Sequence, residues 1–365
     1  MLRVWSVSGA ELAFPAGDVT DVQALKNQIR EQWGIPVSIQ AFLHNQHRLD
    51  LSQKLDKPME LQLVQESFHS TSPNRRLLDL ELIEYAATTG NDEVARRLLD
   101  AGADKDCRCQ DGETVLIRSA AAGHVGIVRL LLGRSASVDL SRSDGKTALT
   151  CSCQNQFVEV SRLLLQVRAS PYKVDSGGKT PLHHAARKGC VETVVLLLQF
   201  NAGCVDLSSG WRTSTPLMDA CRAGHVEAAR LLLRADANPG LCDAYGRTAL
   251  HHAAHGGRSQ SSGRTALLNA LREGHVKATR LLLQAGACPD VCDASGMTPL
   301  HHAALGGRPE MITALLEHGA NKDFQSQNSG RTALLYALRQ GHVEATRLLL
   351  QAGACPDVCD AYGMT

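Results

Sequence analysis

The sequence predicts a mainly α-helical solenoid of stacked helix pairs, preceded by a small domain that mixes strands with one helix. Two observations indicate the solenoid. The segment Gly263–Thr298 recurs at Gly330–Thr365 with only four differences. A shorter unit that opens on a threonine recurs mostly every 33 to 35 residues, a spacing typical of repeat proteins. The opening threonines are Thr114, Thr147, Thr180, Thr215, Thr248, Thr265, Thr298 and Thr332.

One unit shows how its residues specify two helices. Thr180 places an N-cap hydroxyl directly before Pro181, which suits the first helical position because its missing N–H has no partner there. Gly189 ends this helix. A second, amphipathic helix runs from Val191 through three consecutive leucines. A glycine-bearing turn at Asp175–Lys179 precedes the threonine and completes the unit.

The unit closely resembles the ankyrin repeat. Thr-Pro-Leu-His stands intact at Thr180 and Thr298 and nearly intact at Thr248, and the resemblance covers about residues 80–365. It implies an ankyrin-repeat solenoid in which His183, His251 and His301 are structural. It also implies recognition of protein partners by the turn tips and by the first helices on the concave side. The matching positions on the helices are Arg118, His184, Asp219, His252, Asn269, His302 and Tyr336, and those on the tips are Trp211, Arg212, Tyr245, Arg247, Arg264 and Arg331.

Residues 1–66 do not follow the repeat. Alternating apolar residues predict a hairpin of two strands, and Asp21 can cap a helix that buries Val22, Leu25 and Ile29 and ends at Gly34. Further strands fit residues 40–44 and 59–64. This order resembles the ubiquitin-like β-grasp fold.

That second resemblance implies a possible docking surface. The positions that match the exposed apolar patch of the ubiquitin-like family are Val7, Leu43 and Val64, all aliphatic. The resemblance implies that they dock ubiquitin or proteasome receptors. Alternatively, they are strand-forming residues that the first repeat partly covers. Gln65 and Glu66 follow Val64 without a terminal Gly-Gly tail, so conjugation through such a tail is excluded.

Three departures from the regular repeat are expected. Residues 67–79 are predicted to form a polar linker. A degenerate first repeat is predicted from residue 80, with Glu81 and Glu84 near the face that has no neighbouring repeat. The 17-residue step from Thr248 to Thr265 predicts a half-repeat at 248–264 that lacks its second helix. The sequence stops at Thr365 as another repeat opens, which leaves that repeat unfinished and indicates an incomplete gene product.

Composition disfavours several function classes. The 38 basic and 37 acidic residues leave no surplus for a nucleic-acid backbone, and no apolar run reaches the length of a membrane span. The twelve cysteines lie scattered through the repeats, which predicts reduced thiols in the cytoplasm, and the nucleus is also possible. Neither a complete phosphate-binding loop nor a four-ligand zinc spacing occurs, so we expect no cofactor, no metal and no catalytic residues.

The sequence therefore predicts a non-enzymatic interaction scaffold or adaptor. The ankyrin array would bind a protein partner whose identity stays open, and the ubiquitin-like domain would contact receptors. The alternative is that the chain is the recognition part of a larger enzyme or membrane protein whose further domain lies beyond residue 365.

Overall fold

The computed structural model describes residues 2–6, 10–14, 19, 21–44, 47–50, 55, 60–65, 75–200, 203, 205–210, 213–255 and 266–363. The chain divides into two compact units, residues 1–169 and 170–365. The first unit contains the N-terminal sheet and the first repeats, and the second contains the remaining repeats.

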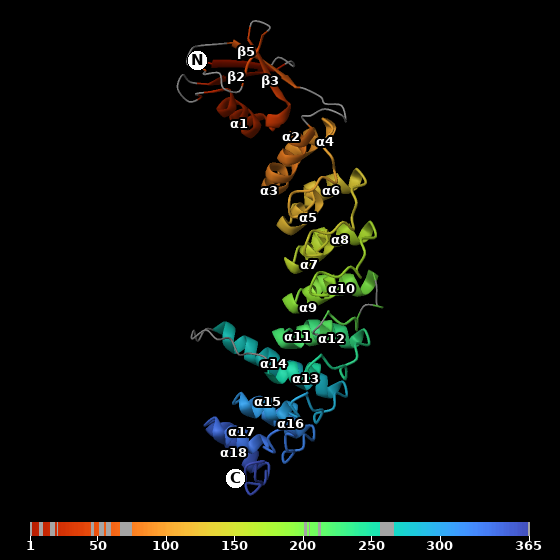
Figure 1. The fold of residues 1–365 in the computed structure, drawn as a ribbon, viewed down its shortest axis with the longest axis vertical. Helices are drawn as coiled ribbons and strands as arrows, with labels where there is room; N and C mark the ends of the chain where they lie inside the picture. Colours follow the sequence, from red (N-terminus) through yellow and green to blue (C-terminus); the bar gives the residue numbers. More distant parts are fainter. Residues whose placement is uncertain are drawn as a thin grey trace. The chain divides into compact units, whose positions relative to one another are not determined.

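The N-terminal domain is a five-stranded mixed sheet with one helix on one face (Figure 1). The strand order is β2-β1-β5-β3-β4, in which β1 and β5 are parallel and the other pairs antiparallel. The parallel pair places the first and last strands side by side in the sheet. The elements are β1 (Leu2–Ser6), β2 (Glu11–Phe14), α1 (Val22–Trp33), the 3-10 helix η1 (Val37–Ile39), β3 (Gln40–His44), β4 (His47–Arg48) and β5 (Glu60–Gln65).

Helix α1 follows the sequence prediction. The Asp21 carboxylate accepts a hydrogen bond from the backbone N–H of Ala24 at 2.8 Å, and Gly34 ends the helix in the left-handed conformation. Its buried apolar residues, which include Leu25 and Ile29, form the domain core together with the inward-facing side chains of β3 and β5, such as Phe42. The predicted helix and its two ends are confirmed.

The first unit continues with three helix pairs. Its helices are α2 (Arg75–Glu81), the π-helical segment η2 (Leu82–Ala86), α3 (Ala87–Thr89), α4 (Asp92–Asp100), α5 (Val115–Ala122), α6 (Val125–Gly133), α7 (Ala148–Gln154) and α8 (Val158–Gln166). The first pair has a composite first helix made of α2, η2 and α3. Helix α2 begins at Arg75, so residues 75–79 are helical and not part of a linker as the sequence predicted. The reason is Leu78, which is completely buried and extends the apolar face of the first repeat toward its N-terminus.

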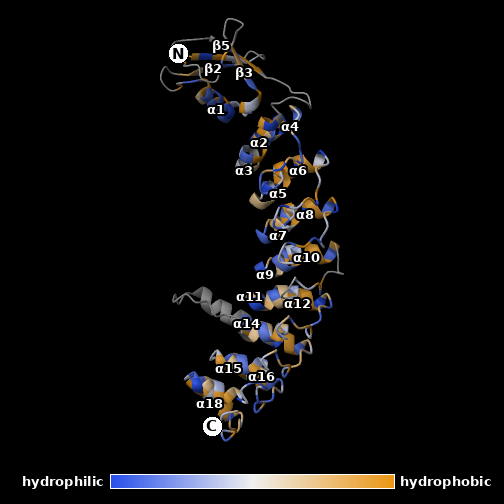
Figure 2. Cartoon of the chain, viewed as in Figure 1, coloured by the Kyte–Doolittle hydropathy of each residue, from blue (hydrophilic) through white to orange (hydrophobic). Residues whose placement is uncertain are grey.

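The second unit repeats the same pattern. Its helices are α9 (Pro181–Lys188), α10 (Val191–Phe200), α11 (Pro216–Ala223), α12 (Val226–Arg234), α13 (Ala249–His255), α14 (Ala266–Gln284), α15 (Pro299–Leu305), α16 (Pro309–Glu317), α17 (Ala333–Arg339) and α18 (Val343–Gln351). Second helices such as α10 are rich in hydrophobic residues, which Figure 2 colours orange. Burial of this apolar surface between neighbouring repeats holds a solenoid together.

Helix α14 departs from the sequence prediction. The pattern between residues 266 and 284 predicts two helices separated at Gly274-His275, but the structure has one continuous helix of 19 residues. Its C-terminal half buries Ala278 and Leu282, and α14 packs against α12, α13 and α16. This half therefore occupies the second-helix position beside α13, so the repeat expected to lack a second helix has one.

The nearly identical segment at 333–351 folds as two helices. There Gly341 has a φ of +72° and separates α17 from α18, whereas Gly274 lies inside α14. Local sequence is almost the same in both places, so the surrounding repeats must decide between one helix and two.

Alanine substitutions at the two glycines are expected to have opposite effects. Gly274→Ala removes a glycine from a helix interior and should stabilise the chain by about 0.5–1 kcal/mol. Gly341→Ala forces a side chain into the left-handed region and should destabilise by about 1–2 kcal/mol. Urea unfolding of both variants measures the difference, and the same sign for both would contradict the continuous helix.

Candidate functional site

A row of charged and polar side chains links successive repeats in the second unit, at their turns and first helices. We call the following residues the polar ladder: Asp175, Lys179, His184, Asp219, Arg222, Asp243, Arg247, His252, Asp293, His302, Arg331 and Asp360. Lys179 Nζ lies 2.9 Å from the carboxylate of Asp219 in the next repeat. Arg331 Nε makes the corresponding contact with Asp360 at 3.0 Å. Together with the contacts of Arg222 with His252 and of Arg247 with Asp293, these pairs join most neighbouring repeats of the second unit through their turns or first helices.

Three histidine–aspartate pairs recur within the ladder. The Nε2 atoms of His184, His252 and His302 lie 2.8, 2.9 and 2.9 Å from carboxylate oxygens of aspartates nine residues earlier in the sequence. All three histidines are buried. The aspartates are Asp175, Asp243 and Asp293, which also accept backbone N–H groups of their own turns. Each pair therefore fixes a turn to the first helix that follows it.

Both Asp243 and Arg222 lie against His252, with Arg222 Nη2 3.1 Å from Nε2, and the shorter contact with Asp243 selects the tautomer. Nε2 faces the Asp243 carboxylate and donates to it, which leaves Nδ1 to accept a hydrogen bond from Arg222 Nε at 3.3 Å. Burial, partly offset by Asp243, lowers the pKa of His252, and the Arg222 charge lowers it further. The imidazole is thus neutral and orients both partners.

The aspartates of these pairs are held ionised. Burial by itself would raise the pKa of Asp243, but hydrogen bonds from His252 and from backbone N–H groups lower it to about 2. The same balance lowers the pKa of Asp293 to about 2, with His302 as the side-chain donor.

The residues predicted to contact a partner fall into two groups. His184, Asp219, His252 and His302 are buried and bonded within the ladder. The more accessible ones are Tyr245, Arg247, Arg331 and Tyr336. Tyr245 is the most exposed, at 45%, and its ring lies 5.5 Å from the Arg247 guanidinium.

Two of the predicted residues, Tyr336 and Arg118, also have internal partners. The Tyr336 hydroxyl lies 2.9 Å from Ser329 Oγ, and its ring packs edge-on against His301. In the first unit, Arg118 Nε donates to Glu113 at 3.0 Å, and the side chain is half-buried. Trp211, Arg212 and Arg264 lie outside the described residues, as does the side chain of Asn269.

Sequence reasoning missed Lys179 and Arg222, which bridge repeats. It also did not use the nine-residue spacing from aspartate to histidine, which occurs three times and would have indicated the buried pairs.

The ubiquitin-like patch is described in part. Leu43 on β3 and Val64 on β5 are both half-exposed. The register pairs Ala41 with Val64 and Leu43 with Gln62, which places Leu43 and Val64 on the same face of the sheet. Val7 lies outside the described residues.

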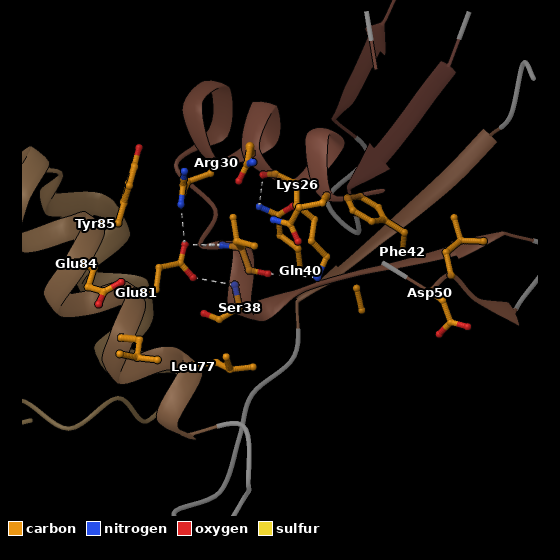
Figure 3. A pocket seen from close by; sticks show the side chains of 16 residues that line it. Lys26, Arg30, Ser38, Gln40, Phe42, Asp50, Leu77, Glu81, Glu84 and Tyr85 are labelled. Carbon is orange, nitrogen blue, oxygen red and sulfur yellow. Dashed lines mark hydrogen bonds and ion pairs between the residues drawn. The ribbon is translucent and has the colours of Figure 1, made fainter. Parts of the chain in front are cut away.

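The junction between the N-terminal domain and the first repeat corrects one prediction. Glu81 was expected near a face without a neighbour, but its carboxylate accepts hydrogen bonds from the backbone N–H groups of Val37 and Ser38 at 2.7 and 2.8 Å (Figure 3). Arg30 lies 3.6 Å from the same carboxylate and 3.6 Å from the centre of the Tyr85 ring. The N-terminal domain therefore covers the end of the repeat array, which explains why the acidic residue tolerates burial.

Among the described residues, no helix is both long and apolar enough to cross a membrane, and no group of three His, Cys, Asp or Glu side chains could hold a metal ion.

The comparisons with known proteins agree with the repeat architecture. The family model described as ankyrin repeats (3 copies) matches residues 82–175, 135–206, 200–261, 256–326 and 286–360. A search of curated proteins found no match. The crystal structure of the human ASB11 ankyrin repeat domain is similar with 26% identity and a TM-score of 0.56, over 67% of this chain and 100% of that chain. No catalytic family was found. The ankyrin family model covers well over half of the sequence, and the chain therefore belongs to the ankyrin-repeat family.

Proposed function

We propose that this protein is a non-enzymatic interaction scaffold whose ankyrin array binds a protein partner. Ankyrin repeats are generally protein–protein interaction modules. The observation that carries the proposal is the combination of the polar ladder with accessible aromatic and arginine side chains at the turns, above all Tyr245 and Arg247. Tyrosine and arginine are enriched among residues that contribute most to interface energy.

The ladder explains how this surface can be pre-organised. Arg247 lies 3.8 Å from the Asp293 carboxylate, which also accepts from His302. This contact restrains Arg247 before a partner arrives, and restraint of an interface side chain lowers the entropic cost of binding.

Comparative affinity capture tests the proposal. Tyr245→Ala should lose a protein that the unmodified chain retains, and Arg280→Ala is the matched control because Arg280 lies exposed on α14, outside the ladder. A protein retained equally by all three forms would contradict binding at the turns.

We further propose that the N-terminal domain is ubiquitin-like and uses Leu43 and Val64 to contact ubiquitin or proteasome receptors. The strand order, the single helix across the sheet and the common face of the two half-exposed side chains support this reading.

Leu43→Ala should separate docking from folding. If Leu43 is an interface anchor, the substitution should weaken binding to a ubiquitin-receptor helix by about 1–2 kcal/mol and leave the melting temperature nearly unchanged. A titration and a melting curve on one sample measure both. A lower melting temperature without a separate effect on binding would instead assign Leu43 to the domain's packing, and no receptor binding by the unmodified chain would end the proposal.

A further inference from the structure

A cavity of about 690 Å³ lies in the first unit, between the N-terminal domain and the first repeat (Figure 3). One wall is the face of α1 that carries Gln23, Asn27 and Arg30, and the opposite wall is the face of α2 and η2 that carries Leu77, Leu80 and Glu84. Strand β3 and η1 form the remaining wall. The volume is in the range that binds small ligands or a short segment of a partner.

The cavity combines apolar surface on α2 with two carboxylates that lack an ion pair among the described residues. Leu77 and Leu80 are 55% and 47% exposed, although both are large apolar residues. Glu84 and Asp50 are exposed carboxylates that also line the cavity, and neither forms an ion pair with another described residue. Exposed apolar surface beside polar groups marks a site of interaction.

The two positively charged side chains that line the cavity already contact groups of the protein itself. Arg30 lies against the Glu81 carboxylate and the Tyr85 ring, and Lys26 is buried with its Nζ 3.3 Å from the Val37 carbonyl oxygen. The charge that remains for a ligand is therefore negative, and it favours a cationic partner.

The lining also offers hydrogen-bonding groups. Within the described part of the chain, Arg30 Nε, Ser38 Oγ and Gln40 Oε1 are buried without a hydrogen-bond partner, and all three residues line the cavity. Buried polar groups in native proteins are almost always paired. A peptide backbone can pair with such a donor and acceptor after a small rotation of these side chains, because it provides both an N–H and a carbonyl oxygen.

We propose that this cavity binds a basic amphipathic peptide segment of a partner protein. Its apolar side chains would pack on Leu77 and Leu80, and its lysine or arginine side chains would pair with Glu84 and Asp50. This surface is distinct from the ankyrin turns and from Leu43 and Val64, so a partner bound here leaves both of those surfaces free.

Fluorescence anisotropy with the full-length chain tests the proposal. The probes are a labelled 12-residue amphipathic peptide of leucine and lysine and the same peptide with glutamate in place of lysine. We expect the lysine peptide to bind and the glutamate peptide not to bind. Leu80→Asp should weaken binding at least tenfold, and Glu84→Lys should weaken the lysine peptide while improving the glutamate peptide.

Val167→Asp is the matched control, because Val167 is 43% exposed in the same unit but does not line the cavity. It should leave peptide binding unchanged, and circular dichroism should show that all variants fold. Equal affinity for both peptides, loss of binding in the control, or unchanged binding by Leu80→Asp would overturn the proposal. A stable dimer in light scattering that the lysine peptide does not disperse would also overturn it, since a second copy of the chain would then be the occupant.

Discussion

Lowering the pH from 7 to 5 is expected to destabilise the second unit strongly. Burial lowers the pKa values of His251, His275 and His301 to about 4, against 6.5 for an unperturbed histidine. Above pH 6.5 these histidines are neutral in both the folded and unfolded states, and their full contribution to stability is present. Between pH 6.5 and 4 only the unfolded state takes up protons, so stability falls by about 1.4 kcal/mol per pH unit for each histidine.

For His251 and His301, the geometry gives the reason that the folded state rejects a proton. His301 Nδ1 accepts the backbone N–H of Thr298 at 3.0 Å, while Nε2 donates to the carbonyl oxygen of Arg331 at 3.0 Å. His251 makes the same contacts with Thr248 and Met297. A proton on Nδ1 would point at the N–H group and break the cap of the first helix.

Urea unfolding at several pH values measures this effect, and His301→Gln supplies the control. The loss of stability between pH 7 and 5 should be smaller in the variant by about 2 kcal/mol. Asp243 and Asp293 have pKa values lowered to about 2, so their contribution is lost only below about pH 4 and does not overlap this window. The same pH dependence in the variant and the unmodified chain would refute the assignment.

Glu81→Ala is expected to have the second large effect, in the first unit. The substitution leaves the N–H groups of Val37 and Ser38 without their acceptor and Arg30 without its partner carboxylate. Because the Glu81 side chain is only 9% exposed, we expect a loss of about 2–3 kcal/mol. Amide hydrogen exchange at Val37 and Ser38 should accelerate in the same variant.

Glu159→Ala is the control for Glu81→Ala. Glu159 is 52% exposed and pairs only loosely with Arg129 and Arg162, at 3.8 and 3.5 Å. Its substitution should change stability by less than about 0.5 kcal/mol. Equal stability of the two variants, with unchanged exchange at Val37 and Ser38, would show that the N-terminal domain does not depend on this contact.

The repeat helices were predictable because their signals are local. A threonine or aspartate N-cap and a glycine with positive φ act within a few residues, as Thr114 and Gly123 do at the two ends of α5. The ankyrin family followed from the same signals. The start of α2 at Arg75 was missed because two arginines precede the Leu77-Leu78 pair and Asp79 follows it, and this local pattern does not show that packing buries Leu78.

Contacts across long sequence distances were not predictable. Glu81 meets Val37 across 44 residues, and nothing in the local pattern around Glu81 indicates a partner. The single helix α14 was missed for a related reason, since its near-copy at 333–351 folds as two helices. The candidate partner residues were identified by repeat position, which cannot tell the buried His302 from the half-buried Tyr336 at the same position of its repeat.

Amide hydrogen exchange of the full chain, free and bound to a partner retained by affinity capture, tests the scaffold proposal most directly. We expect protection to increase at the turns around Asp243–Arg247 and Ser326–Arg331, where Tyr245, Arg247 and Arg331 lie. Protection confined to second helices such as α12 and α16, with the turns unchanged, would contradict binding through this surface.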